Sequence, residues 1–186
     1  MTISSEKLLN DLIDRTLKNS AAAEKFNALS IEELNLNIAK DSWSILECLE
    51  HLNLYGDFYL PEIKKRIENS KTSAAENFKS GILGNYFAHM MLPKEQVNKM
   101  KTFTSMNPIR SKLDKTTVTR FITQQEQLLK ILEQAKKIDL NKTKTSISIS
   151  KLIKIKLGDT FKVVIYHNER HIAQAKKIVA VNAVRF

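Results

Sequence analysis

Residues 159–182 read DTFKVVIYHNERHIAQAKKIVAVN, and this stretch repeats apolar side chains at the period of an α-helix. At about 100° per residue, one face collects apolar side chains together with two histidines. The members of that face are Thr160, Val163, Val164, His167, His171, Gln174, Ala175, Ile178 and Val181. Lysines and an acid occupy the opposite face. The pattern therefore predicts a helix that begins with Asp159 as N-cap and directs both histidines inward.

Three further segments show the same helical period: residues 3–18, 43–69 and 116–137. Ser42 precedes the second of them and is a favourable N-cap residue. Pro61 lies inside that segment, and a proline within a helix predicts either a kink or a division into two helices. Together with the last stretch, these segments give four principal helices.

The remaining chain is harder to interpret. Residues 70–115 contain glycines and prolines that interrupt any long period, which predicts short helical turns around 76–92 and then irregular chain, a crossover that covers a site. Residues 146–159, SISISKLIKIKLGD, alternate like a strand. A single strand has no sheet to join, so we interpret it mainly as an extended linker. The sequence thus predicts an all-α helix bundle forming a single domain over residues 1–186.

The composition argues against a nucleic-acid-binding, membrane or secreted protein. The 186 residues carry a net charge of +10, yet the lysines are scattered and not interleaved with aromatic residues. This predicts solvated helix faces rather than a nucleic-acid surface. No apolar run approaches the roughly 20 residues that span a bilayer, and the N-terminal residues lack a secretory signal. With Cys48 as the single cysteine, no intramolecular disulfide forms. We expect a cytoplasmic protein without a membrane partner.

Three of the histidines are the candidate ligands of a metal ion. His167 and His171 lie one helical turn apart, so one divalent metal can accept both imidazoles, although a buried histidine also commonly bonds a backbone carbonyl. His51, in SWSILECLEHLNLY, borders the apolar side of another helix. If the two helices pack there, three imidazoles converge and leave a position open for water or substrate. Zinc or nickel is the first expectation for the metal, with iron or copper as alternatives.

The motifs WSILECLEHL, residues 43–52, and HNERHIAQ, residues 167–174, resemble those of the DinB/YfiT-like superfamily. The resemblance covers roughly residues 5–183. It implies a four-helix bundle with a long crossover connection and a metal held by His51, His167 and His171. Characterised members of the family include thiol-dependent transferases and isomerases that use mycothiol or bacillithiol, and many others have no known substrate.

Three polar neighbours have two interpretations each. Gln174 either orients an imidazole or a bound water, or bonds a neighbouring helix group. Glu47 is a fourth ligand or a general base, or else, as we favour, a surface acid or a partner of Arg170. Arg170 either anchors an anionic substrate or forms a structural ion pair, and the second is favoured.

Other residues near the motifs are expected to be structural. Tyr55 is a hydrogen-bond donor to the site or, more commonly, a core or rim tyrosine. Cys48 is a soft ligand or, as we favour, a small buried side chain. His89 lacks a partner at ligand spacing and is predicted not to bind metal. Trp43 is predicted to be a core anchor.

The sequence has no nucleophile elbow, phosphate-binding loop, dinucleotide fingerprint or paired-cysteine motif. We therefore expect a metal-dependent enzyme that activates water or a thiol, as a hydrolase or a thiol S-transferase acting on a small molecule, with a low-molecular-weight thiol as a candidate co-substrate. The alternative is a non-catalytic basic helical module that binds nucleic acid or a protein partner. A homodimer through an exposed helix face is compatible with either hypothesis.

Overall fold

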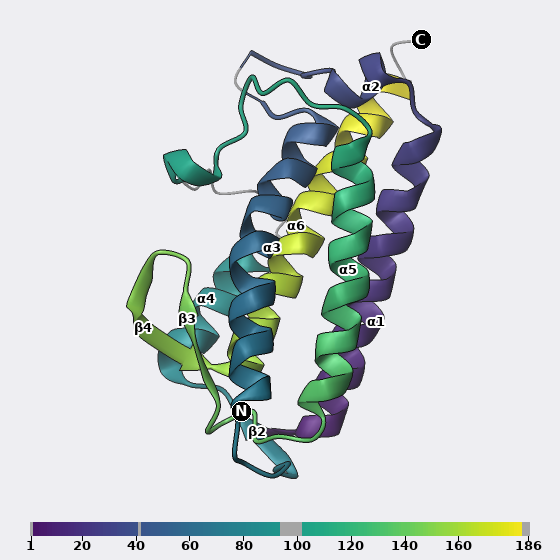
Figure 1. Ribbon diagram of the computed structural model, residues 1–186. Helices are drawn as coiled ribbons and strands as arrows, with labels where there is room; N and C mark the ends of the chain where they lie inside the picture. The colour runs from purple at the N-terminus through teal and green to yellow at the C-terminus, as the bar shows by residue number, and fades with distance from the viewer. Residues whose placement is uncertain (1, 41, 94–101, 184–186) are drawn as a thin grey trace.

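The computed structural model describes residues 2–40, 42–93 and 102–183. In this part of the chain the structure is mostly helical (Figure 1). The helices are α1 (Ser5–Glu24), α2 (Ile31–Asn35), α3 (Ile45–Glu68), α4 (Ile82–Met91), α5 (Thr116–Ala135) and α6 (Leu157–Ala183), with short 3-10 turns at Lys25–Ala28 and Thr104–Met106. The strands are β1 (Thr2–Ser4), β2 (Asn77–Lys79), β3 (Lys144–Ile147) and β4 (Ser150–Lys156).

Four long helices, α1, α3, α5 and α6, lie side by side along the molecule (Figure 1). They correspond to the four segments whose periodicity predicts helices, and each turns its apolar face toward the others. Fully buried residues such as Leu12, Ile63, Leu132 and Phe161 meet between them. Burial of one such side chain contributes about 1.5–3 kcal/mol, so the shared apolar faces dominate the packing.

Of the three clusters of buried apolar residues, the two larger ones divide the long helices along their length. On α3, His51 adjoins Leu52, where one cluster ends, and Tyr59 begins the other. On α6, His167 and His171 fall between residues of the same two clusters. The histidines therefore occupy the border between two apolar regions, where α3 packs against α6.

The start of α3 differs from the prediction. Ser44, not Ser42, is the N-cap, because the Ser44 side chain accepts from the Glu47 amide while the Glu47 carboxylate accepts from the Ser44 amide. This reciprocal capping box satisfies two amides that the first helical turn leaves unpaired. The Ser42 hydroxyl instead bonds the backbone of Ala39. The helix then continues through Pro61 without dividing.

The start of α6 also differs. The helix begins at Leu157, and Asp159 lies within its first turn rather than at the N-cap. The Leu157 amide bonds the Thr143 carbonyl at 2.9 Å, so the preceding strand pair leads directly into the helix. The fully buried Asp159 carboxylate accepts from the Gly81 amide at 2.8 Å. Asp159 thus fixes the beginning of α4 to the beginning of α6.

The predicted linker over residues 146–159 is wrong, because most of it forms a β-hairpin. β3 and β4 pair antiparallel, with Thr145 opposite Ile155 and a register shift between Ser146 and Ile147. The partner strand β3 begins only two residues before this stretch and ends within it, so the two strands form a two-stranded sheet of their own. Ile147 and Ile155 pack against α4 and α6, and these contacts anchor the hairpin to the helices.

The segment between α3 and α5 contains a short helix followed by irregular chain, as predicted, whereas its role in covering a site stays a prediction. The helical turns expected around 76–92 correspond to α4, although β2, which pairs with β1 at the N-terminus, was not foreseen. Residues 102–115 are irregular apart from one 3-10 turn. Residues 94–101 of the predicted crossover lie outside the described residues.

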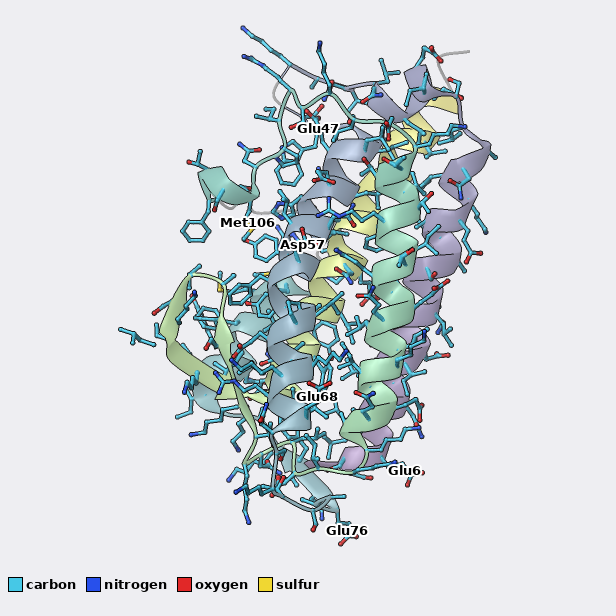
Figure 2. All side chains as sticks on the ribbon, in the orientation of Figure 1. Glu6, Glu47, Asp57, Glu68, Glu76 and Met106 are labelled. Atoms are coloured by element: carbon cyan, nitrogen blue, oxygen red, sulfur yellow. The ribbon has the colours of Figure 1, made fainter. Side chains whose placement is uncertain are left out.

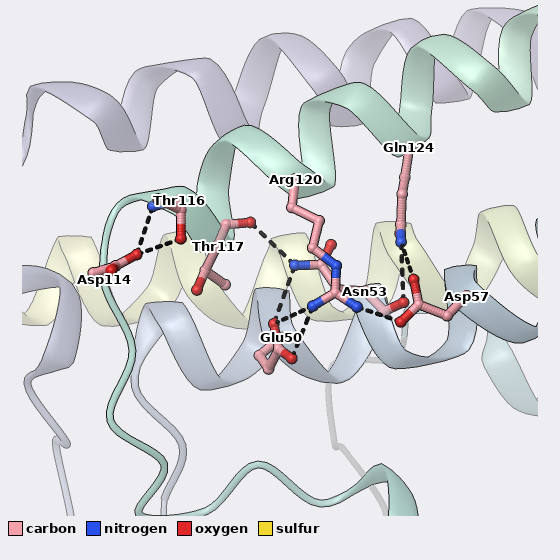
Figure 3. A network of polar contacts seen from close by, with 8 residues as sticks. All are labelled: Glu50, Asn53, Asp57, Asp114, Thr116, Thr117, Arg120 and Gln124. Carbon is pink, nitrogen blue, oxygen red and sulfur yellow. Dashed lines mark hydrogen bonds and ion pairs between the residues drawn. The ribbon is translucent and has the colours of Figure 1, made fainter.

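A polar network joins α3 to α5 (Figure 3). Arg120 binds both oxygens of Glu50, at 3.1 and 3.2 Å, and also contacts Asp57. Gln124 donates to Asp57 at 2.9 Å. Gly56 permits this close approach, since a Cβ there would lie 2.0 Å from the Gln124 Oε1.

Among the described residues, no helix is both long and apolar enough to cross a membrane.

Candidate metal centre

The three predicted ligands come together between α3 and α6. One ring nitrogen from each of His51, His167 and His171 lies within 4.8 Å of the other two, and the ring centroids are 4.7–4.9 Å apart. The Nε2 atoms of His51 and His167 are separated by 3.1 Å. Packing of α3 against α6 thus brings His51 to the pair formed by His167 and His171, which is the condition on which the expected three-histidine group depends.

The His51 ring is oriented by a backbone carbonyl. Its Nδ1 lies 2.6 Å from the Met106 oxygen. A carbonyl oxygen can only accept, so the Nδ1 of His51 carries the hydrogen and its Nε2 carries a lone pair in the neutral ring. That lone pair faces His167. The loop between α4 and α5 therefore fixes the tautomer of a side chain on α3.

The His171 ring is oriented from within its own helix. Its Nδ1 lies 3.0 Å from the Gln174 Oε1, an acceptor that selects the tautomer with the hydrogen on Nδ1. The Nε2 of His171 is then left with its lone pair. Of the two interpretations of Gln174, orientation of an imidazole is the one that the structure supports.

All three imidazoles are held in the neutral form. Burial lowers the pKa of His51 to about 4, and the hydrogen bond to the Met106 carbonyl acts in the opposite direction. Burial, followed by the adjacent His51 ring, lowers the pKa of His171 to about 3. Burial also lowers the pKa of His167 well below its usual value, with further contributions from the other two rings and Arg170. Neutral imidazole is the form that binds a metal.

Two aromatic side chains, both half-buried, border the histidines. The Trp43 ring lies 4.6 Å from His51 and 5.5 Å from His171, between ring centroids. The Tyr55 ring lies 5.0 Å from His51 and 4.8 Å from His167. Trp43, predicted to be a core anchor, therefore also forms part of the surroundings of the site. Two open surface depressions lie elsewhere and contain none of the histidines.

The favoured interpretation of Glu47 is wrong. The residue is only 5% exposed, and its oxygens accept from the amides of Ser44 and Arg110 and from the Asn37 side chain. It is neither a surface acid nor a member of the histidine group among the described residues. The Arg170 guanidinium instead reaches α4, where it donates to the Met90 carbonyl at 3.0 Å.

Two further candidates, Cys48 and His89, lie outside the histidine group in the described part of the chain. Cys48 is fully buried, burial raises the pKa of its thiol, and it does not join the histidine group. His89 is exposed and bonds the Asn85 carbonyl of its own helix. The sequence interpretation missed Met106, because a backbone carbonyl carries no side-chain signal. The capping box formed by Ser44 and Glu47 can be recognised in the sequence, since the two residues follow the S-x-x-E pattern.

A scan against protein-family models matches the chain to the DinB superfamily over residues 12–175. The match spans α3 and most of α6, and so includes all three histidines of the candidate centre. No curated protein and no solved structure matches the chain significantly. The family match extends over far more than half of the 186 residues, and the chain belongs to the DinB superfamily.

Proposed function

We propose that His51, His167 and His171 hold one divalent metal and that the protein is a metal-dependent enzyme, a hydrolase or a thiol S-transferase. The proposal rests mainly on one observation. His51 and His171 each direct Nδ1 to an acceptor outside the group, which leaves the Nε2 lone pairs for a common ligand. Imidazoles that bind metals are typically oriented in this way through their second nitrogen.

The separation of two of the three rings fits a bound metal, and the three ring nitrogens lie within 4.8 Å of one another. Two imidazole nitrogens on a tetrahedral zinc, each about 2.0–2.1 Å from the ion, lie about 3.4 Å apart. The 3.1 Å between the Nε2 atoms of His51 and His167 is close to this value. Neutral imidazoles suit zinc, nickel, iron and copper, and we infer zinc or nickel, with iron or copper as alternatives. Three ligands from the protein also leave one coordination position of the metal open for a reactant.

A bound metal of this kind lowers the pKa of a water or a thiol, so that it serves as a nucleophile near neutral pH. The chain itself orients the imidazoles and surrounds them with the rings of Trp43 and Tyr55. Burial raises the pKa of Tyr55, which keeps its hydroxyl protonated as a hydrogen-bond donor. Glu47 does not serve as general base, because three N–H groups already occupy its oxygens.

The finer assignments belong to the same proposal. We infer a small-molecule substrate, with a low-molecular-weight thiol as candidate co-substrate, and a cytoplasmic location. The packing of α1, α3, α5 and α6 supports a four-helix bundle with a long crossover connection, formed as one domain over residues 1–186. A homodimer is a further expectation, which light scattering tests.

Metal analysis of protein produced without a polyhistidine tag tests the metal centre. We expect about one equivalent of metal per chain in the wild type, as one three-histidine site requires, and loss of that metal in the His167→Ala variant. His89→Ala is the matched control, since His89 is exposed and outside the group, and it should retain the metal. Equal, sub-stoichiometric metal in all three proteins would contradict the proposal.

An activity panel then separates the two reaction classes. The metal-loaded protein is assayed with ester and amide substrates, and with electrophiles in the presence of low-molecular-weight thiols. Turnover that requires both a thiol and the metal identifies a transferase, while turnover without a thiol identifies a hydrolase. Binding to DNA with a steep salt dependence and no turnover would favour the basic binding module instead.

A further inference from the structure

The Glu47 carboxylate connects the beginning of α3 to the loop that contacts His51. Its Oε2 accepts from the Ser44 amide and from the Asn37 side chain, both at 2.8 Å. Its Oε1 accepts from the Arg110 amide at 2.6 Å. Figure 2 shows Glu47 at one end of α3 and Met106 on the adjacent loop. A capping box needs only the first of these contacts, so the bond to Arg110 requires another explanation.

Arg110 has an unusual backbone conformation. Its φ is 61°, and it is the non-glycine residue with positive φ among those described. Most side chains disfavour this left-handed conformation, which persists where surrounding contacts hold it. The short hydrogen bond from the Arg110 amide to Glu47 is such a contact. It attaches the loop to α3 at a point where the chain reverses direction.

The loop between this attachment and His51 is braced by its own turns. The Met106 amide bonds the Phe103 carbonyl, the Asn107 amide bonds the Thr104 carbonyl, and the Ser111 amide bonds the Pro108 carbonyl. The Ile109 amide also donates to the Asn107 Oδ1 at 3.3 Å, which joins the turn that contains Met106 to the turn that contains Arg110. Because these bonds together restrict the backbone from 103 to 111, fixing the Arg110 end also restricts the Met106 end. The Met106 carbonyl is the group that accepts from the Nδ1 of His51 at 2.6 Å.

We propose that Glu47 is a positioning residue for the His51 imidazole. It holds the Arg110 amide, the loop then presents the Met106 carbonyl, and that carbonyl selects the His51 tautomer whose Nε2 lone pair faces His167. Glu47 touches neither the imidazole nor a reactant. The consequence for metal affinity rests on the proposed function, whereas the consequence for the tautomer does not.

Glu47→Gln is the informative variant because it separates the two roles of the carboxylate. If the glutamine oxygen keeps the Ser44 and Asn37 contacts, its NH2 group faces the Arg110 N–H, donor against donor. The cap survives and the attachment of the loop is lost. Glu33→Gln is the matched control: Glu33 forms the same capping box with Ser30 at the start of α2, remote from the histidines in sequence.

Two measurements test the proposal on the full chain. Imidazole ¹H–¹⁵N correlation spectra of the metal-free protein report the tautomer of His51, assigned with a His51→Asn variant. We expect hydrogen on Nδ1 in the wild type and in Glu33→Gln, and a mixture of tautomers in Glu47→Gln. Zinc titration against a chromophoric chelator should show affinity lower by about 10–100-fold in Glu47→Gln, as for other changes to groups that orient a ligand, and unchanged in Glu33→Gln.

The outcomes distinguish this proposal from the metal centre itself. A wild type that binds no zinc contradicts the proposed function, and the tautomer spectra still decide the role of Glu47. An unchanged His51 tautomer in Glu47→Gln overturns the positioning role, whatever the zinc affinity. If that variant does not fold, hydrogen exchange of the wild-type Arg110 amide decides. Protection comparable to that of the Ser44 amide supports the attachment, and free exchange refutes it.

Discussion

The Nε2 atoms of His51 and His167 lie 3.1 Å apart, with the hydrogen of His51 on its other nitrogen. Space for at most one hydrogen therefore remains between the two rings in the metal-free protein. Protonating either ring fully would place a charge in a buried site beside another imidazole. This relationship makes the site sensitive to acid.

The metal-free protein should lose stability as the pH falls below about 6.5, the usual pKa of histidine. Folded His51 and His171 have pKa values of about 4 and about 3, so the unfolded chain binds more protons in this range. The free energy of unfolding then rises with pH and falls on acidification down to about pH 3–4. Urea unfolding at several pH values measures the slope. A His171→Asn variant should show a shallower slope than the His89→Asn control, and identical slopes would refute the explanation.

Replacing Gln174 with alanine should weaken metal binding by about 10-fold or more, because the Nδ1 of His171 loses the acceptor that fixes its tautomer. Zinc titration of the tag-free protein measures the effect. Gln127→Ala, an exposed change on α5, serves as the control and should bind zinc like the wild type. Equal affinity in the two variants would mean that Gln174 does not orient the ligand.

Gly84→Ala should destabilise the protein by about 1–3 kcal/mol through overpacking. A Cβ at Gly84 would lie 2.5 Å from the Cβ of Asp159, which is fully buried and cannot move aside. The gain in helix propensity, about 1 kcal/mol, only partly offsets the clash. At Gly81 the nearest atom to an added Cβ is 3.5 Å away, so Gly81→Ala should have a much smaller effect. Thermal unfolding of both variants compares them directly.

The two faces of the β-hairpin should respond differently to substitution. Ile155 is 4% exposed and packs against α4 and α6, so Ile155→Ala should cost about 2–5 kcal/mol. Leu152 is 93% exposed, and Leu152→Ser should change stability by no more than about 0.5 kcal/mol. Chemical denaturation distinguishes this outcome from an extended linker, in which neither residue would matter.

The four long helices and the inward direction of His167 and His171 could be predicted from the sequence, because both depend on periodic side chains. The contribution of His51 followed from the resemblance of the motifs rather than from periodicity. The face that contains His167 and His171 also contains the residues that pack inward, so the direction of the imidazoles followed from the pattern. The hairpin at residues 144–156 could not be recognised from alternation alone, since its partner strand carries the short, polar-rich sequence KTSI.

The groups that orient the site were harder to predict. His171 obtains its acceptor from Gln174, one turn away on the same face, and that spacing is visible in the sequence. His51 obtains its acceptor from the backbone of Met106, in an irregular loop 55 residues distant. The sequence favours Glu47 as a surface acid or a partner of Arg170, whereas the loop covers the Glu47 carboxylate and the Arg110 amide donates to it.

The candidate ligands also bear on how the protein unfolds. His51 and His167 are separated by 116 positions, so an ion that joins them acts as a cross-link closing most of the chain into a ring. Such a link reduces the entropy of the unfolded chain, and its binding free energy adds to that of folding. Withdrawing the ion would loosen α3 from α6 at the boundary between the two halves of the core, and chelation would expose the interior there first.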